Sequence, residues 1–187
     1  MRGLDTRQSI ARACSHAAES RNPRQFGAGK FDVVLDPLPF ANLLQNVGSA
    51  ASIYSVETGF SCLKGKTGKR VAGSGFSLYD DGMIRNGVGS SKFDEEGVPT
   101  QRTPIIENGF LKGYLHNTST ARRYRTKTTA NAGILGPEPS NLVINEGDMS
   151  TEELNREVKE GLYITNTWYT RFQNYMSGEF FHYPEGW

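Results

Sequence analysis

The stretch Phe93–Arg122 decides the fold that we expect, and it reads FDEEGVPTQRTPIIENGFLKGYLHNTSTAR. An acidic turn opens it, and two apolar runs then flank the dipeptide Asn108-Gly109. Both central positions of a two-residue hairpin turn need positive φ, which asparagine and glycine tolerate best. The stretch therefore predicts an antiparallel β-hairpin with strands at Thr103–Glu107 and Phe110–Leu115.

Helix and strand signals on either side of this hairpin complete an α+β pattern. Helical periodicity predicts helices at residues 5–20, 39–54 and 150–160, the last opened by a capping box of Ser150 and Glu153. Short strands are predicted at residues 31–35, 69–72, 76–79, 162–167 and 169–172, with a turn at 80–82. We expect a mainly antiparallel, twisted sheet or partly open barrel, with about three helices against it.

Composition narrows the class of protein. Among 187 residues, 21 are Lys or Arg and 20 are Asp or Glu, so the formal net charge is only +1. This balance argues against a dedicated binder of polyanions. The two cysteines are too few for a disulfide framework, and we expect buried thiols. No apolar run is long enough to cross a bilayer, and the first residues lack the apolar segment of a secretory signal, so we expect a cytoplasmic protein.

Several segments in chain order resemble the TldD/PmbA (TldE) metallopeptidase family, whose members are implicated in trimming peptides and unfolded chains. The matching segments are Phe31–Pro37, Gly65–Val71, Asp80–Gly82, Phe93–Arg122 and Pro139–Gly147. The run Asn166–Tyr175, NTWYTRFQNY, resembles the archaeal-type TldE branch in particular. The resemblance covers nearly all of residues 31–180 and implies the C-terminal-domain fold of that family.

The resemblance also implies an altered metal site. Catalytic members carry a zinc-binding His-Glu-x-x-x-His helix, and the positions of its two histidines and its glutamate fall here at Gln45, Ala50 and Asn46. Zinc needs imidazole nitrogens or thiolates, and hydrolysis needs a carboxylate that takes a proton from the bound water. We therefore predict no catalytic and no metal-binding residue in this chain. The alternative interpretation of Gln45 and Asn46 is that they are ordinary solvent-facing helix residues.

No other residues are expected to replace these ligands. The family's remaining zinc ligand is a cysteine that lies beyond the last residue of this chain, so the resemblance does not assign that role to Cys62. The histidines His16, His116 and His182 show no compact ligand spacing. We expect each of them to have another role.

Both ends depart from the family pattern, and we expect a fragment. We interpret residues 1–29 as a remnant helix and linker, and residues 30–180 as an incomplete C-terminal domain. After Gly178-Glu179-Phe180 the TldE branch continues in a pattern like Ser-Thr-Ile-Pro-Arg-Asp, whereas this chain reads FHYPEGW. One inserted nucleotide rereads codons of the first pattern as the second. Our hypothesis is that residues 181–187 are a frameshifted tail, and genuine divergence is the alternative.

The acidic turn is one candidate for a substrate cleft. Asp94, Glu95 and Glu96 are consecutive carboxylates, and Asp80 and Asp81 lie upstream. Calcium takes several oxygen ligands, so a hard-cation site is an alternative, although the spacing matches no calcium loop. The resemblance suggests instead that this turn shapes a peptide cleft.

The polar run after the hairpin is the second candidate. Tyr114, His116 and Asn117 lie in a segment of the kind that often carries function. The alternative is that the segment only caps the next helix, with Thr118 or Ser119 as N-cap. Both interpretations stay open.

The resemblance implies a TldE/PmbA-type subunit that needs no cofactor of its own. Its partner would be a zinc-bearing TldD-type subunit, and together they would act on peptides or unfolded polypeptides, which this chain would position by strand addition. Two alternatives remain: a stand-alone peptide-binding or scaffold protein, and a weak nucleic-acid binder that uses the basic segment Arg122–Lys127.

Overall fold

The computed structural model describes residues 6–19, 21 and 27–184, and the side chains of these residues other than 8, 168–169 and 181–184. The chain divides into a large unit, residues 44–147 and 172–180, and a small unit, residues 1–43, 148–171 and 181–187. Three elements continue across the division: α2 (Pro37–Ala50), β7 (Thr167–Asn174) and β8 (Glu179–Pro184).

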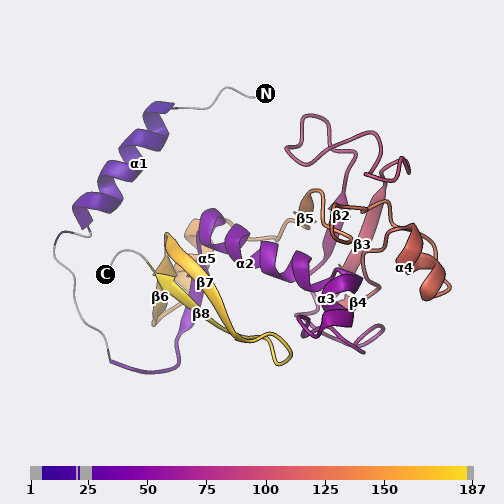
Figure 1. Cartoon of the computed structure of the whole chain (residues 1–187). Helices are drawn as coiled ribbons and strands as arrows, with labels where there is room; N and C mark the ends of the chain where they lie inside the picture. Colours follow the sequence, from indigo (N-terminus) through magenta and orange to yellow (C-terminus); the bar gives the residue numbers. More distant parts are fainter. Residues whose placement is uncertain (1–5, 20, 22–26, 185–187) are drawn as a thin grey trace. The chain divides into compact units, whose positions relative to one another are not determined.

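The large unit is built on a four-stranded antiparallel sheet in the order β4-β3-β2-β5 (Figure 1). Its strands are β2 (Leu78–Asp81), β3 (Arg102–Glu107), β4 (Phe110–Leu111) and β5 (Leu142–Ile144). Asn108 and Gly109 adopt φ values of 50° and 84°, so the predicted hairpin turn is confirmed. Among the described residues β4 and β5 are edge strands of this sheet, which is therefore open.

The strands of the large unit differ from the prediction at several boundaries. Asp80 and Asp81 are part of β2 and do not form a turn. Residues 69–72 contribute only an isolated bridge, between Arg70 and Phe110. The strand that starts at Phe110 ends after two residues, and Leu115 exchanges backbone hydrogen bonds with Ala51 and Ile53 instead.

The core of the large unit lies between the sheet and the second half of α2. Its buried side chains are Leu44, Ala51, Leu63, Leu78, Ile105, Ile106, Leu111 and Leu115. Gly48 of α2 lies so close to β5 that an added Cβ atom would be 2.5 Å from Cδ1 of Leu142. A glycine here lets the helix backbone approach the sheet edge. Two short helices follow in this unit, α3 (Ile53–Thr58) and α4 (Thr118–Arg123), in addition to the three predicted helices.

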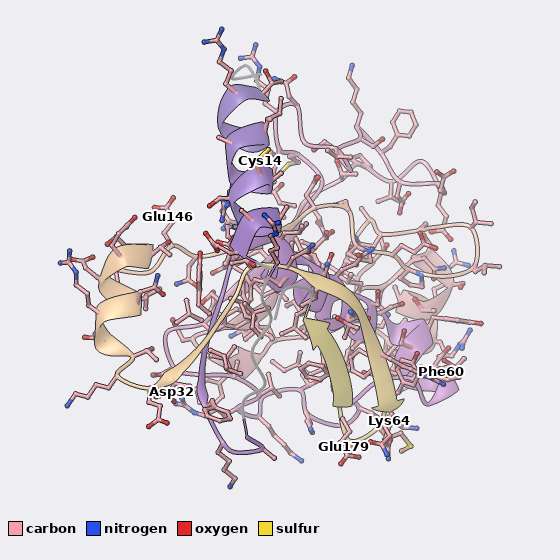
Figure 2. All side chains as sticks on the ribbon, turned by 90° about the vertical axis from the view of Figure 1, so that its left-hand side faces the viewer. Cys14, Asp32, Phe60, Lys64, Glu146 and Glu179 are labelled. Carbon is pink, nitrogen blue, oxygen red and sulfur yellow. The ribbon has the colours of Figure 1, made fainter. Side chains whose placement is uncertain are left out.

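The turn between β7 and β8 also belongs to the large unit. The rings of Phe60 and Tyr175 meet edge to face with their centroids 5.3 Å apart, and Phe172 stacks on Tyr175 at 5.0 Å. Figure 2 labels Phe60, Lys64 and Glu179 in this corner of the unit. Aromatic contacts therefore fix the turn against the segment that follows α3.

The small unit contains a parallel pair of strands, which the mainly antiparallel prediction did not include. β1 (Asp32–Leu35) pairs in parallel with β6 (Gly161–Ile164), with Val33 opposite Leu162. The intervening chain is long enough for the crossover that a parallel pair needs. Buried Asp36 follows β1, pairs with Arg12 and accepts a 2.8 Å hydrogen bond from the hydroxyl of Tyr163.

The helices of this unit agree with the prediction in position, but the cysteine on one of them is exposed. α5 (Thr151–Glu157) begins with the predicted capping box, in which Ser150 and Glu153 satisfy each other's backbone. α1 (Thr6–Glu19) presents Ile10 and Cys14 to solvent, so the expectation of a buried thiol is wrong for Cys14. Cys62, in the large unit, is half-buried.

The predictions for the chain ends lie partly outside the described residues. These exclude residues 1–5, most of the linker and residues 185–187. The fragment and frameshift hypotheses stay predictions. Within the described residues, no helix combines the length and the apolar character that crossing a membrane requires.

Candidate functional site

Asp94 organises the acidic turn. Its Oδ1 accepts hydrogen bonds from the backbone N–H groups of Glu96 at 3.0 Å and Val98 at 2.9 Å. Its Oδ2 accepts a third, 3.0 Å, from the N–H of Ala132. An aspartate that binds the backbone two residues on is typical of a tight turn. Asp94 therefore shapes this turn and attaches it to the segment around Ala132.

Glu96 and Asn117 meet at the start of α4. Asn117 is the N-cap, and its Oδ1 accepts a 2.9 Å hydrogen bond from the N–H of Thr120, whose side chain completes a capping box. Glu96 Oε2 accepts a 2.8 Å hydrogen bond from the N–H of Thr118. The predicted N-caps Thr118 and Ser119 are wrong by one and two residues, because Asn117 has the extended backbone that a cap needs. The acidic turn and the polar run are thus joined.

His116 is buried next to this cap. Its Nδ1 lies 3.2 Å from Oγ1 of Thr120, and its backbone N–H donates a 2.7 Å hydrogen bond to Oγ1 of Thr129. The ring lies against Tyr124, with centroids 5.6 Å apart. Burial lowers the pKa of His116, and the nearby Glu57 carboxylate opposes this only in part. His116 is therefore a neutral, packed side chain near pH 7.

Tyr114 has a different environment. Its hydroxyl donates a 2.7 Å hydrogen bond to the carbonyl oxygen of Leu63, and its ring packs against the hydrophobic core. Tyr114 is therefore directed into the core. The other predicted cleft residues lie in a single hydrogen-bonded region, which contains Asp94, Glu95, Glu96, His116 and Asn117.

A buried carboxylate on β2, that of Asp80, contacts the segment that follows this region. Asp80 is 1% exposed, and its Oδ2 accepts a 2.5 Å hydrogen bond from Nδ2 of Asn131. Its Oδ1 accepts hydrogen bonds from the N–H of Ser140 at 2.6 Å and from the Ser140 hydroxyl at 3.0 Å. Burial raises the pKa of Asp80, although these hydrogen bonds oppose the rise. The network ties β2 to the segment that leads into β5.

A pocket of about 310 Å³ opens between the acidic turn and residues 130–140. Its lining includes Phe93, Asp94, Glu95, Asn131, Ile134 and Glu138. The carboxylates of Glu95 and Glu138 are exposed and have no ion-pair partner within the described residues. The volume is of the size that small-molecule pockets have.

The α2 segment in which the resemblance implies the altered metal motif has no carboxylates like those of the pocket. Gln45 is exposed, and Asn46 and Ala50 are half-buried. The carbonyl oxygen of Ala50 accepts a 2.6 Å hydrogen bond from the Ser61 hydroxyl. No three His, Cys, Asp or Glu side chains lie together as a metal site in the part of the chain that the structure describes. Amide and methyl groups do not fit zinc, so these α2 side chains are no set of ligands for it.

The basic segment Arg122–Lys127 ends α4. Its side chains are exposed, and Arg123 donates a 2.6 Å hydrogen bond to the Glu57 carboxylate of α3. Tyr124 lies against His116. Arg125 has φ 53°, which is the left-handed conformation of a helix end. The segment has the geometry of a salt-bridged helix terminus.

The sequence pattern of the PmbA/TldA metallopeptidase C-terminal domain matches residues 28–187. This chain belongs to the PmbA/TldA metallopeptidase family. The family resemblance of the hairpin, the acidic turn and the polar run is thereby confirmed, and so is the mainly antiparallel α+β fold.

Relatives of the PmbA/TldA family support the same assignment. A metalloprotease of Methanocaldococcus jannaschii is 41% identical over 142 residues, which are 73% of this chain and 32% of that protein. A Thermotoga maritima crystal structure, named as a candidate modulator of a DNA gyrase, matches with TM-score 0.82 at 33% identity over 88% of this chain and 38% of that one. TldE from Thermococcus kodakarensis matches with TM-score 0.76 at 26% identity over 89% of this chain and 39% of that one. This chain thus spans 32–39% of the length of these relatives.

Two features of this PmbA/TldA domain were missed by sequence reasoning. The partnership of Asp80 with Asn131 and Ser140 joins residues that are 51 and 60 positions apart. Glu138 lines the same pocket as the acidic turn, yet nothing near it in sequence marks it. One signal was present: Asp80 lies two residues after Leu78, on the same face of a strand, so a carboxylate was due to face the core.

Proposed function

We propose that this chain is the TldE/PmbA-type subunit of a two-component metallopeptidase. In this proposal the zinc and the chemistry belong to a TldD-type partner, and this chain helps to enclose and position the peptide. The proposal is supported mainly by the α2 segment, which has Gln45, Asn46 and Ala50 where the family resemblance implies the metal motif. The likeness to TldE from Thermococcus kodakarensis supports the same subunit type.

The role in peptide positioning rests on the pocket beside the acidic turn. Asp94 and Glu96 hold this turn rigidly by accepting backbone hydrogen bonds, so the pocket wall is preorganised. Glu95 and Glu138 leave two carboxylates available at its surface. Peptide or unfolded polypeptide is the proposed substrate, and the cytoplasm stays the predicted compartment.

Co-expression with a TldD-type subunit tests the subunit role. We predict that the two chains co-purify in a fixed ratio, and that peptide cleavage appears only when both are present. The chain alone should show no peptidase activity with or without added zinc. Cleavage by the chain alone would contradict the proposal.

The two alternative functions predict different results. A stand-alone peptide-binding protein would bind peptide but would not retain a TldD-type subunit through gel filtration. A nucleic-acid binder would show an affinity for DNA that falls steeply with salt concentration. Arg122 is exposed and is not part of the Arg123–Glu57 ion pair. In a nucleic-acid binder, Arg122→Gln would therefore weaken DNA binding without disturbing the contact between α3 and α4.

A further inference from the structure

The pocket beside the acidic turn contains two carboxylates that the fold does not use. Asp94 is fully engaged, since it accepts three backbone hydrogen bonds. Glu95 and Glu138 are exposed, and their side chains have no hydrogen-bond or ion-pair partner within the described residues. An acidic pair at a pocket with no Lys or Arg in its described lining favours a cationic ligand.

The wall of the same pocket also contains a buried acceptor without a donor among the described residues. Asn131 is 3% exposed and lines the pocket. Its Nδ2 donates to Asp80 Oδ2 and, at 3.0 Å, to the carbonyl oxygen of Glu138. These two bonds fix the amide orientation, and Oδ1 is then left without a donor in the part of the chain that the structure describes. A buried acceptor without a donor costs free energy, so the fold leaves one polar group of the pocket wall unsatisfied.

Apolar side chains lie in the same lining. Phe93 is 59% exposed and Ile134 is 92% exposed. Large apolar side chains that remain this open beside a pocket are available to cover an apolar part of a ligand. The pocket thus combines negative charge, an unsatisfied acceptor and an apolar rim.

We propose that this pocket binds the amino-terminal residue of a peptide, with its α-ammonium held by Glu95 and Glu138 and its side chain against Phe93 and Ile134. This inference rests on the proposed function, because it specifies which end of a substrate peptide this subunit holds. An α-ammonium sits one bond from the carbon that carries the side chain, so it matches a pocket where carboxylates and apolar groups share one lining. A lysine ammonium is separated from its backbone by four methylene groups and matches this arrangement less well.

Fluorescence anisotropy with defined peptides tests the proposal on the full chain. The probe is Phe-Gly-Gly-Gly-Gly with a dye at its carboxyl end, in a free-amine form and an N-acetylated form. A third peptide, acetyl-Gly-Gly-Lys-Gly-Gly with the same dye, presents an ammonium only on a side chain. We expect the free-amine form to bind about tenfold more tightly than either acetylated peptide, since hydrogen bonds to charged groups are lost.

Charge-neutral variants assign that difference to the pocket. In the double variant Glu95→Gln/Glu138→Gln, the free-amine and N-acetylated peptides should bind with equal Kd. Both positions are exposed, so the variant should fold like the native chain, which its thermal unfolding would verify. The matched control is Glu146→Gln, because Glu146 is an exposed carboxylate of the large unit that does not line the pocket (Figure 2).

Three outcomes with the free-amine and N-acetylated peptides would overturn the inference. They are equal affinity of the native chain for the free-amine and N-acetylated peptides, discrimination that survives in the double variant, and no saturable binding of the free-amine peptide. Preference for the lysine peptide over the free-amine peptide would assign the acidic pair to side-chain ammonium groups and would also overturn it. Co-purification with a TldD-type subunit is measured separately, so failure of this inference and failure of the proposed function are distinguishable.

Discussion

The acidic turn at Phe93–Thr100 and the α2 segment at Gln45–Ala50 both stand out in the sequence, but they serve the structure in different ways. In the turn, the carboxylates of Asp94 and Glu96 accept backbone hydrogen bonds and join three segments. In α2, Gly48 lets the helix pack closely against β5 while Gln45 faces solvent. A cluster of ionisable residues therefore does not by itself indicate a binding or catalytic site. The carboxylates without an internal partner are the ones available to a ligand.

The largest effect is expected behind the acidic turn, at Asp80. Asp80→Ala removes the acceptor for Asn131 and Ser140 and leaves their donors buried, so we expect a loss of about 3 kcal/mol in the free energy of unfolding. Urea denaturation measures this. Asp80→Asn is the matched control, since it keeps one acceptor oxygen and the shape of the side chain, and it should cost less. A loss below about 1 kcal/mol for Asp80→Ala would show that the network does not support the pocket wall.

The second effect separates neighbouring carboxylates of the turn itself. Asp94→Ala should lower the free energy of unfolding by about 2 kcal/mol, because three backbone N–H groups lose a charged acceptor. Glu95→Ala should change it by less than about 0.5 kcal/mol, since Glu95 is exposed. Parallel urea titrations of the two variants check the contrast. Equal effects would break the distinction between structural and available carboxylates.

The third effect concerns α2. Gly48→Leu should destabilise the chain by about 1–3 kcal/mol, because even a Cβ atom at this position would come within 2.5 Å of Leu142. Gln45→Ala should change stability by less than about 0.5 kcal/mol. Thermal unfolding of both variants compares the stability contributed by the packed face and by the solvent-facing side of α2. A neutral Gly48→Leu would contradict the close packing of α2 on β5.

The smallest effect is a dependence of stability on pH. Burial lowers the pKa of His116 below its unfolded value of about 6.5. At a pH near this value the unfolded state therefore binds more protons than the folded state. The free energy of unfolding should therefore decrease as pH falls from about 7.5 through 6.5, by at most about 1.4 kcal/mol per pH unit for one proton. His116→Gln should show a shallower decrease in urea titrations at several pH values. An unchanged slope would place His116 in solvent.

Local interactions are the part of this fold that the sequence predicts well. The Asn108-Gly109 turn and the capping box of Ser150 and Glu153 depend on residues within three positions of each other, and both are confirmed. The parallel pairing of β1 with β6 was not predicted, because its partners, such as Val33 and Leu162, are far apart in the chain. No turn signal encodes a pairing of that separation.

In the candidate site, too, the local features were predictable from the sequence and the contacts between distant segments were not. The sequence pointed to the acidic turn and to Asn117 as polar loops, and the structure joins them, but mainly through caps and turn hydrogen bonds. The pocket depends on Asn131 and Glu138, which approach the turn only through the fold. His116 was expected in a polar loop and is buried, because Thr120 and Thr129 supply partners for its polar groups.

Zinc analysis of the purified chain, alone and in complex with a TldD-type subunit, is the sharpest test of the proposed division of roles. We predict no stoichiometric zinc in the chain alone and zinc in the complex, in an amount that matches the TldD-type subunit. One tightly held zinc per chain in the isolated protein, together with peptide cleavage that a chelator abolishes, would contradict this division.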